Sequence, residues 1–193
     1  MKRKGDIVLG MSGGIDSTVA ALLLQKEGYA VLGVTLKLAD HYIEDHGKQS
    51  HVIERARTVC ERFGIEHLTA DRTADFDACV VDYFAESYVK GLTPNPCVQC
   101  NRRLKWEALL DIADERGIAG VATGHYARVG KANGRYHLLK GRDAVKDQSY
   151  FLWRLTQEQL SRTVFPLGDV TKQEIRRLAE EWGLPQSAQA ESQ

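Results

Sequence analysis

The sequence predicts an α/β protein with a doubly wound, mostly parallel sheet, a small β-hairpin and a helical C-terminal segment. Three observations lead to this fold class. Apolar runs alternate with amphipathic stretches in the order strand–helix–strand–helix–strand–helix, which is typical of parallel sheets covered by helices on both faces. The first apolar run ends in a glycine-rich loop, where such sheets bind ligands. Farther along, Asn133-Gly134 separates two short runs and is a strong hairpin signal.

The first predicted unit is strand, helix and strand. Asp6–Met11 is a short apolar run. Thr18–Glu27 carries apolar residues at helical spacing, and Gly28 is its stop signal. Ala30–Leu38 is rich in Val and Leu, so we expect a buried strand there.

The second unit follows a polar connection. Asp40–Ser50 is charged and is expected to be a loop, after which Val52–Phe63 has the pattern of a helix that stops at Gly64. Ile65–Ala70 is the third predicted strand, and Ala74–Lys90 is an amphipathic helix.

The third unit begins with a loop, Gly91–Asn101, which contains two prolines. Leu104–Arg116 is a predicted helix and Gly120–Thr123 a small strand. Tyr126–Val129 and Arg135–Leu139 are the two strands of the hairpin.

The last predicted element is a helix that ends at Trp182. Thr171 with Glu174 three residues later forms a capping box, which marks its start. We place a break after Leu139, so that residues 1–139 form one domain and residues 140–193 a smaller helical extension.

The composition excludes several classes of protein. The 193 residues include 26 basic and 26 acidic side chains, so no global charge marks a nucleic-acid binder. No apolar run approaches the roughly 20 residues of a membrane span, so we expect no membrane association and a cytoplasmic location. Four cysteines in a chain of this length do not resemble a disulfide framework.

The glycine-rich loop is the first candidate site. Its adjacent glycines let successive N–H groups point into one concavity at a helix N-terminus, which suits a pyrophosphate group. It matches neither the Walker A nor the dinucleotide-binding pattern. We interpret Asp16 as a Mg²⁺ ligand, the alternative being a plain glycine turn with Asp16 as helix cap. The loop comprises Gly10, Met11, Ser12, Gly13, Gly14, Ile15, Asp16 and Ser17.

A second candidate site holds two thiols three positions apart, Cys97 and Cys100, just before the predicted helix. A helix N-terminus and nearby cations lower a thiol pKa, which makes Cys100 a plausible nucleophile or sulfur carrier. The alternatives are half of a zinc site, a redox pair or two buried thiols. Cys60 and Cys79 fall on apolar helix faces and are expected to lie in the core.

The loop with the strand before it resembles the PP-loop of the ATP pyrophosphatases, which cleave ATP between the α and β phosphates. Further motifs in order resemble the tRNA-specific 2-thiouridylase family, and the match spans nearly the whole chain. They are Thr93–Cys100 with Asn101, Ala122–Tyr126, Lys146–Leu152 and Phe165–Gly168. The resemblance implies a fold like that of the adenine nucleotide α-hydrolases, with residues 1–139 as the ATP-binding catalytic domain.

The resemblance also implies roles for residues. The loop, with backbone at Leu36 and Gly124, would bind ATP, and Cys100 would be the nucleophile. ATP would adenylate O2 of the wobble uridine, and a persulfide sulfur would then attack C2. The implied reactants and partners are ATP, Mg²⁺, tRNA and a persulfide donor, either a cysteine desulfurase or a sulfur-relay protein. The residues expected to contact tRNA are Asn95, Pro96, Cys97, Lys146, Asp147 and Gln148.

Three departures from the family pattern matter. Leu36 stands where the family usually has Met, which a backbone contact tolerates. Cys97 stands where many members have Asp, and if that Asp is an acid–base group, Cys97 changes the chemistry. The alternatives for Cys97 are a catalytic role, ligation of an iron–sulfur cluster together with Cys100, or neither. The chain ends at Gln193, where the family continues with a second essential cysteine and tRNA-gripping domains. We therefore expect a truncated form that binds ATP but thiolates tRNA poorly.

Two other functions remain open: a PP-loop enzyme that adenylates a small molecule, and a nucleotide-binding module without full activity. Between Asn101 and Lys146, ten basic residues face five acids, which is either a phosphate-backbone footprint or a solvated surface. His125 follows a strand end and either contacts nucleotide or caps a turn. The remaining expectations are a polar loop at His41, His46 and His51 and packing roles for Trp106, Trp153 and Trp182.

Overall fold

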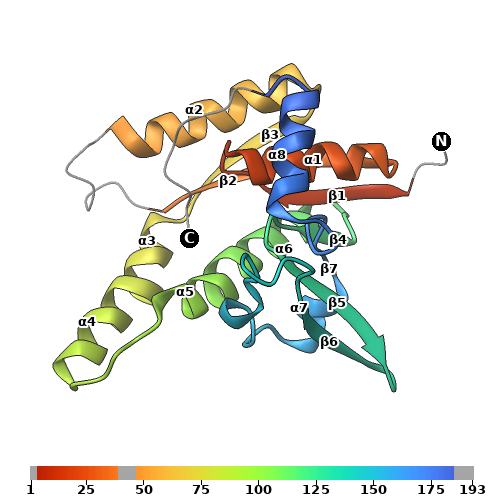
Figure 1. The fold of residues 1–193 in the computed structure, drawn as a ribbon. Helices are drawn as coiled ribbons and strands as arrows, with labels where there is room; N and C mark the ends of the chain where they lie inside the picture. Colours follow the sequence, from red (N-terminus) through yellow and green to blue (C-terminus); the bar gives the residue numbers. More distant parts are fainter. Residues whose placement is uncertain (1–3, 39–46, 185–193) are drawn as a thin grey trace.

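The computed structural model describes residues 4–38 and 47–184. Five strands form one parallel sheet in the order β3-β2-β1-β4-β7, as Figure 1 shows. The chain builds outward from β1 to β3 and then crosses to the other side of β1, so the switch point lies between β1 and β4. The α/β class with a parallel sheet is confirmed. The strands are β1 (Gly5–Gly10), β2 (Tyr29–Lys37), β3 (Glu66–Asp71), β4 (Gly120–Ala122) and β7 (Thr163–Val164).

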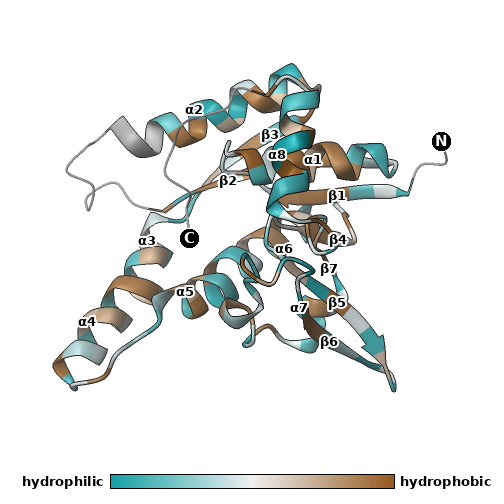
Figure 2. Cartoon of the chain, in the orientation of Figure 1, coloured by the Kyte–Doolittle hydropathy of each residue, from teal (hydrophilic) through white to brown (hydrophobic). Residues whose placement is uncertain are grey.

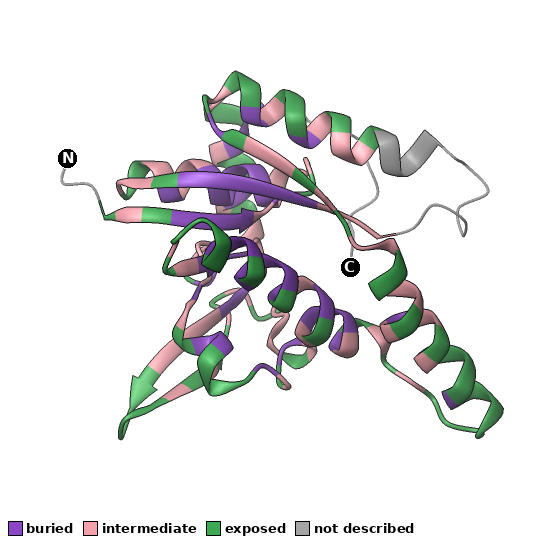
Figure 3. Cartoon of the chain, turned by 180° about the vertical axis from the view of Figure 1, so that it is seen from behind, coloured by how far each residue is buried: buried purple, intermediate pink, exposed green. Residues whose placement is uncertain are grey.

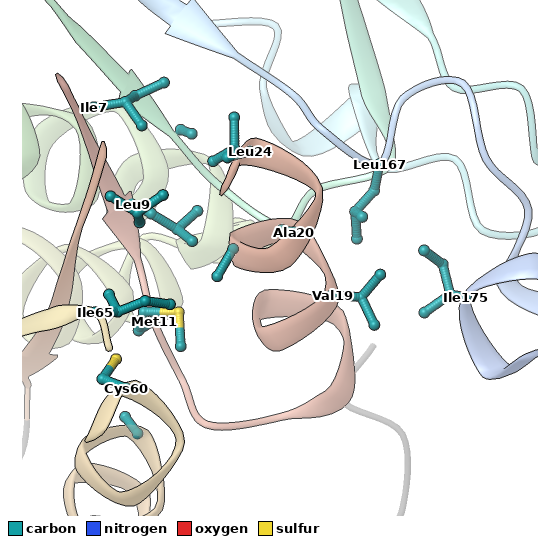
Figure 4. Close-up of a cluster of buried hydrophobic side chains, with 14 of the residues drawn as sticks. Ile7, Leu9, Met11, Val19, Ala20, Leu24, Cys60, Ile65, Leu167 and Ile175 are labelled. Carbon is teal, nitrogen blue, oxygen red and sulfur yellow. The ribbon is translucent and has the colours of Figure 1, made fainter. Parts of the chain in front are cut away.

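Alternation along β1 explains why helices cover both faces. Ile7 and Leu9 pack into one cluster of buried side chains and Val8 into another, because successive residues of a strand point to opposite faces. The first cluster lies under α1, α2 and α8, and Figure 4 shows Val19 of α1 close to Ile175 of α8 within it. The second lies under α6. The helices are α1 (Ile15–Lys26), α2 (Gly47–Arg62), α6 (Glu107–Glu115) and α8 (Lys172–Glu181).

A long helical arm leaves the sheet after β3. It consists of α3 (Thr73–Phe76), a π-helical turn (Asp77–Val81) and α4 (Asp82–Val89), which confirms the predicted helix 74–90. Figures 1 and 3 show the arm projecting from the body, with α4 largely exposed. Phe84, Val89 and Leu92 are exposed in or just after α4, and Figure 2 colours parts of the arm brown, the colour of hydrophobic residues.

A second long helix begins earlier than the sequence predicted. It runs from α5 (Pro96–Gln99) through a π-helical turn (Cys100–Trp106) into α6. The expectation of a loop over residues 91–101 is therefore wrong after Asn95. Asn95 is extended and Pro96 takes the first helical position, where its missing N–H costs nothing. Pro94 therefore lies in the predicted loop, whereas Pro96 marks the start of a helix.

The hairpin is confirmed. β5 (Ala127–Ala132) and β6 (Arg135–Lys140) pair antiparallel. The turn residues Asn133 and Gly134 have φ angles of 50° and 75°, as this tight hairpin turn requires.

The C-terminal part contains more than the predicted last helix. A 3₁₀ turn (Ser149–Phe151), α7 (Gln157–Ser161) and β7 precede α8, and the capping box at Thr171 is confirmed. β7 completes the main sheet beside β4. The division at residue 139 stays a prediction.

Two further helices also start before their predicted positions: α1 at Ile15 and α2 at Gly47, so the expected loop at 40–50 is helical from residue 47. Residues 40–46 lie outside the described part. None of the helices in residues 4–38 and 47–184 combines the length and apolar character that a membrane crossing needs.

Candidate functional site

The glycine-rich loop from Gly10 to Ser17, called the anion loop from here on, lies at the switch point of the sheet. β1 pairs with β2 on one side and β4 on the other, and it ends at Gly10. The Met11 N–H then donates to Val34 O at 2.8 Å, and α1 begins after Gly14. The first-turn N–H groups of α1 have no partner within the helix, so they favour an anion at this position.

Gly13 is required by the shape of the loop. Its φ is +68°, and a Cβ atom there would lie 2.7 Å from the Ala56 nitrogen and 2.9 Å from Arg55 Cβ. The loop therefore curls against α2 at a distance that only glycine permits.

The loop hydroxyls have divided roles. Ser17 is buried, and its Oγ donates to Gly14 O at 3.1 Å and accepts from the Ser12 N–H at 3.3 Å. Thr18 Oγ1 also donates to Gly14 O, at 2.9 Å. Ser17 thus holds the loop shape, while Ser12 is exposed and its Oγ lies 3.2 Å from Ser17 Oγ.

Asp16 is the charged residue of the loop, and it is bound by two residues from the second half of the chain. Tyr126 Oη donates to Asp16 Oδ1 at 2.9 Å. Lys172 Nζ donates to both carboxylate oxygens, at 2.7 and 2.9 Å. Lys172 was not among the residues predicted to form the site. The signal that would have found it is a cation in the first turn of a helix, where the helix dipole disfavours positive charge.

The other predicted ATP contacts reach the same edge of the sheet. A Cβ atom on Gly124 would lie 3.3 Å from the Ser17 nitrogen, so the segment after β4 packs directly against the loop. Leu36 is partly buried near the end of β2, two residues past the Val34 carbonyl that binds Met11. The structure thus brings together the residues predicted to bind ATP.

His125 links the loop region to the second candidate site. Its Nδ1 is 2.8 Å from Thr123 Oγ1, and its ring lies 5.7 Å from that of Trp106. Burial, followed by the charge of Lys105, lowers the pKa of His125 to about 3. The imidazole is therefore neutral at physiological pH and offers a hydrogen bond, not a positive charge.

The two thiols differ in exposure. Cys97 is exposed in the first helical turn, whereas Cys100 is buried one turn later beside Val80 and Leu104. Burial raises the pKa of Cys100, and the positive charge of Lys105 only partly opposes this. The expectation of a lowered pKa is therefore wrong, because Cys100 is one turn past the helix N-terminus and is packed in an apolar cluster.

The other cysteines are packing residues. Cys60 is fully buried, which raises its pKa to about 11 and confirms a core position. Cys79 is only half-buried and packs against the cluster around Cys100. In the described ranges we find no group of three or more His, Cys, Asp and Glu side chains able to hold a metal ion.

The residues predicted to contact tRNA form two patches. Asn95, Pro96 and Cys97 sit at the start of α5, where Asn95 and Cys97 are exposed. Asp147 accepts from the Gly141 N–H and Ser149 Oγ, both at 2.8 Å, and Gln148 Oε1 accepts from the Tyr126 N–H at 3.0 Å. These side chains shape the 146–148 loop and fasten it to Tyr126.

The surplus of basic residues between residues 101 and 146 is partly neutralised in the folded structure. Three of its arginines pair with acids outside that window: Arg116 with Glu66 at 2.9 Å, Arg128 with Asp169 at 3.2 Å, and Arg142 with Glu174 at 3.2 Å. Counting charges in a sequence window misses acids that the fold brings in from elsewhere.

The remaining candidates divide clearly. Trp106 is fully buried and Trp182 partly buried, as expected, but Trp153 is 68% exposed, so its packing role is wrong. His51 is exposed on α2, whereas His41 and His46 lie outside the described residues.

Comparisons with known proteins agree with this site. A family model described as the tRNA methyl transferase HUP domain matches residues 5–193. A tRNA-specific 2-thiouridylase MnmA from Chlorobium luteolum is 46% identical over 195 residues, which cover 100% of this chain and 52% of the relative. The chain thus spans about half the length of the curated relatives it matches.

Solved structures share the fold. The U34-tRNA thiolase NcsA from Methanococcus maripaludis, with its 4Fe–4S cluster, aligns with a TM-score of 0.60 at 21% identity, over 97% of this chain and 59% of that one. A 4-thiouridine synthetase in complex with RNA and bound ATP aligns with a TM-score of 0.62 at 23% identity, over 93% of this chain and 41% of that one.

Proposed function

The chain belongs to the tRNA methyl transferase HUP domain family, and on that basis we propose that it acts in the ATP-dependent 2-thiolation of a tRNA wobble uridine. Its curated relatives are named tRNA-specific 2-thiouridylases, which are enzymes. We place the reaction in the cytoplasm, with tRNA as substrate and a cysteine desulfurase or sulfur-relay protein as persulfide donor.

One observation carries the proposal: residues 123–126 connect the anion loop with the helix that carries Cys97 and Cys100, called the thiol helix. Gly124 packs against Ser17, and Tyr126 binds Asp16. Between them, the ring of His125 lies 5.7 Å from that of Trp106, which is on the same π-helical turn as Cys100. This arrangement supports the assignment of a nucleotide in the loop and a thiol on the helix to one reaction site.

The first chemical step is adenylation. Gly10 to Ser17, with backbone at Leu36 and Gly124, bind ATP so that the phosphates meet the first-turn N–H groups of α1. Uridine O2 attacks the α-phosphorus, pyrophosphate leaves, and O2 is converted into a good leaving group. The loop amides stabilise negative charge on the phosphates in this step.

Sulfur transfer follows. The terminal sulfur of the donor persulfide attacks C2, and AMP departs with O2. The Cys100 thiolate then attacks the inner sulfur of the persulfide. The S–S bond breaks, 2-thiouridine is released, and Cys100 and the donor thiol form a disulfide. Burial raises the pKa of Cys100 and so disfavours its thiolate. The positive charge of Lys105 acts in the opposite direction and supports deprotonation of Cys100 in this step.

The residues of the site suit Mg²⁺ better than they suit an iron–sulfur cluster. A carboxylate such as Asp16 suits Mg²⁺, which neutralises phosphate charge when bound. An iron–sulfur cluster of the four-iron type takes four thiolates. Cys97 and Cys100 supply two, and residues 4–38 and 47–184 gather no group of three ligands. We therefore derive no step through a cluster.

The tRNA contacts are proposed at the two patches described above. Asn95, Pro96 and Cys97 lie one turn from Cys100, and Lys146 precedes the loop that Asp147 and Gln148 hold in shape. The target base enters between them, because the site must bring C2 of the uridine to the thiol.

The test follows the products of ATP. The chain is incubated with ATP labelled at the α-phosphate, with a small-molecule persulfide as sulfur donor, and with unmodified tRNA that has uridine at the wobble position, and AMP and pyrophosphate are quantified. We expect tRNA to stimulate AMP formation. The matched control is the same tRNA with cytidine at that position, which should not stimulate.

Equal stimulation by both tRNAs, or release of ADP, would contradict the proposal. AMP formation driven by a small amide or carboxylic acid in place of tRNA would favour a small-molecule synthetase. ATP binding without any turnover would favour a nucleotide-binding module.

A further inference from the structure

Lys172 forms a charged cluster with the anion loop. Its Nζ contacts Asp16 Oδ1 and Oδ2 at 2.7 and 2.9 Å and lies 6.0 Å from the centroid of the Tyr126 ring. The side chains of Lys172 and Asp16 are 17% and 32% exposed, so the pair is largely sheltered yet still open to a ligand. The cation reaches the loop from a position 156 residues later in the chain.

The backbone of Lys172 is anchored on both sides. Thr171 caps α8 through the Glu174 N–H, and Glu174 accepts from the Thr171 N–H at 2.7 Å. The Lys172 N–H itself donates to Asp143 Oδ2 at 2.9 Å. These hydrogen bonds fix the backbone at Lys172, so its ammonium group is held beside the anion loop.

The charge of Lys172 is unfavourable at its position in the helix. Lys172 is the first residue of α8, where the positive end of the helix dipole disfavours a cation. Residues that break a local rule without a local gain are often functional. For Lys172, the compensating interaction is its ion pair with Asp16.

The loop itself supplies no cation. Residues 10 to 17 contain no Lys or Arg, and Asp16 adds a negative charge where a polyphosphate is expected. A Walker A loop solves this problem with its own lysine. Here a lysine from a remote helix already touches the loop carboxylate.

We propose that Lys172 is a nucleotide-binding residue whose ammonium moves from Asp16 to the phosphates when ATP occupies the loop. The proposal rests on the proposed binding of ATP by residues 10–17. The carboxylate released by Lys172 keeps its hydrogen bond from Tyr126 and becomes available as a magnesium ligand. The C-terminal helix α8 thereby becomes part of the nucleotide site.

The experiment measures binding without turnover. Isothermal titration calorimetry compares α,β-methylene ATP with adenosine, in the presence of Mg²⁺, for the wild-type chain and for Lys172→Met and Lys172→Arg. We expect Lys172→Met to weaken binding of the analogue by about 10- to 100-fold, as loss of a charge-assisted hydrogen bond predicts, and to leave adenosine binding within about twofold. Lys172→Arg should retain most of the affinity.

The matched control is Lys90→Met, which removes an exposed ion pair with Glu86 at the far end of α4. It should bind both ligands as the wild-type chain does. Thermal melts of the variants exclude loss of fold as the cause of weak binding.

The inference is overturned if Lys172→Met binds the analogue within twofold of wild type, or if it loses adenosine and analogue equally, since that indicates a structural role. A wild-type chain that fails to bind the analogue overturns this inference together with ATP binding. A wild-type chain that binds it but shows no tRNA-dependent AMP formation overturns the proposed function alone.

Discussion

Gly13 shows how strongly a single position in the anion loop is constrained. We expect Gly13→Ala to lower the free energy of unfolding by about 2–4 kcal/mol, because a positive φ and a backbone overlap both add cost. Urea unfolding measures this change. Nucleotide binding should weaken as well, since the loop must move away from α2.

Gly64→Ala is the matched control. Gly64 has a φ of +64°, but a Cβ atom there meets nothing within 4 Å. It should cost about 1–2 kcal/mol, from backbone conformation alone. Equal costs at the two positions would show that the contact with α2 is unimportant.

At this scale, sequence reasoning found residues that carry a local pattern and missed those that depend on distant partners. Gly10 to Ser17 form a contiguous motif, so their site was predictable. Lys172 was not, because its meaning comes from Asp16, far away in sequence. The raised pKa of Cys100 was also beyond reach, since burial depends on Val80 and Leu104 packing around it.

One hydrogen bond joins two elements of the site. Trp106 Nε1, at the end of the π-helical turn, donates to Thr163 Oγ1 of β7 at 2.7 Å, and both residues are buried. We expect a double-mutant cycle of Trp106→Phe and Thr163→Val to give a coupling energy of about 0.5–1.5 kcal/mol. Chemical unfolding of the four proteins measures it.

Thr163→Ser is the control for this cycle, because it keeps the hydroxyl. The cycle of Trp106→Phe with Thr163→Ser should give a coupling energy close to zero, because serine preserves the hydrogen bond. A coupling near zero for the Val cycle would mean that the tryptophan contributes only packing.

Element boundaries were predictable wherever hydrophobic period and stop signals agreed, as in the helix 74–90 and the hairpin. They failed at Pro96, because proline occurs both in loops and at the first position of helices, and only the extended Asn95 shows that a helix starts here. Strand β7 was missed because two residues carry no period. Its pairing with β4 comes from the fold, not from local sequence.

The whole molecule should lose stability in mild acid. The pKa of His125 is lowered to about 3, so protons bind the unfolded chain preferentially once the pH falls below the ordinary histidine value of about 6.5. Stability is therefore present above that value and declines as the pH falls toward 3. We expect His125 to cost on the order of 2 kcal/mol between pH 7.5 and pH 5.

His125→Asn tests this expectation, because Asn keeps a polar group near Thr123 but does not titrate. Guanidinium unfolding at both pH values should show a smaller decrease for the variant than for wild type. The carboxylates with lowered pKa values, such as Asp71 and Asp143, lose their contribution only at lower pH. Equal decreases in the two proteins would contradict the assignment to His125.

The late position of β7 has a consequence for synthesis of the chain. β4 ends at Ala122, but the strand that covers its free edge arrives only at Thr163, and the side chains that close the core over α1 arrive later still, with Leu167, Ile175 and Ala179. At about 5–20 residues per second, a ribosome needs several seconds to make that stretch. During this interval the nascent protein presents an open strand edge and an apolar helix face, so this is the period in which it depends most on protection from aggregation.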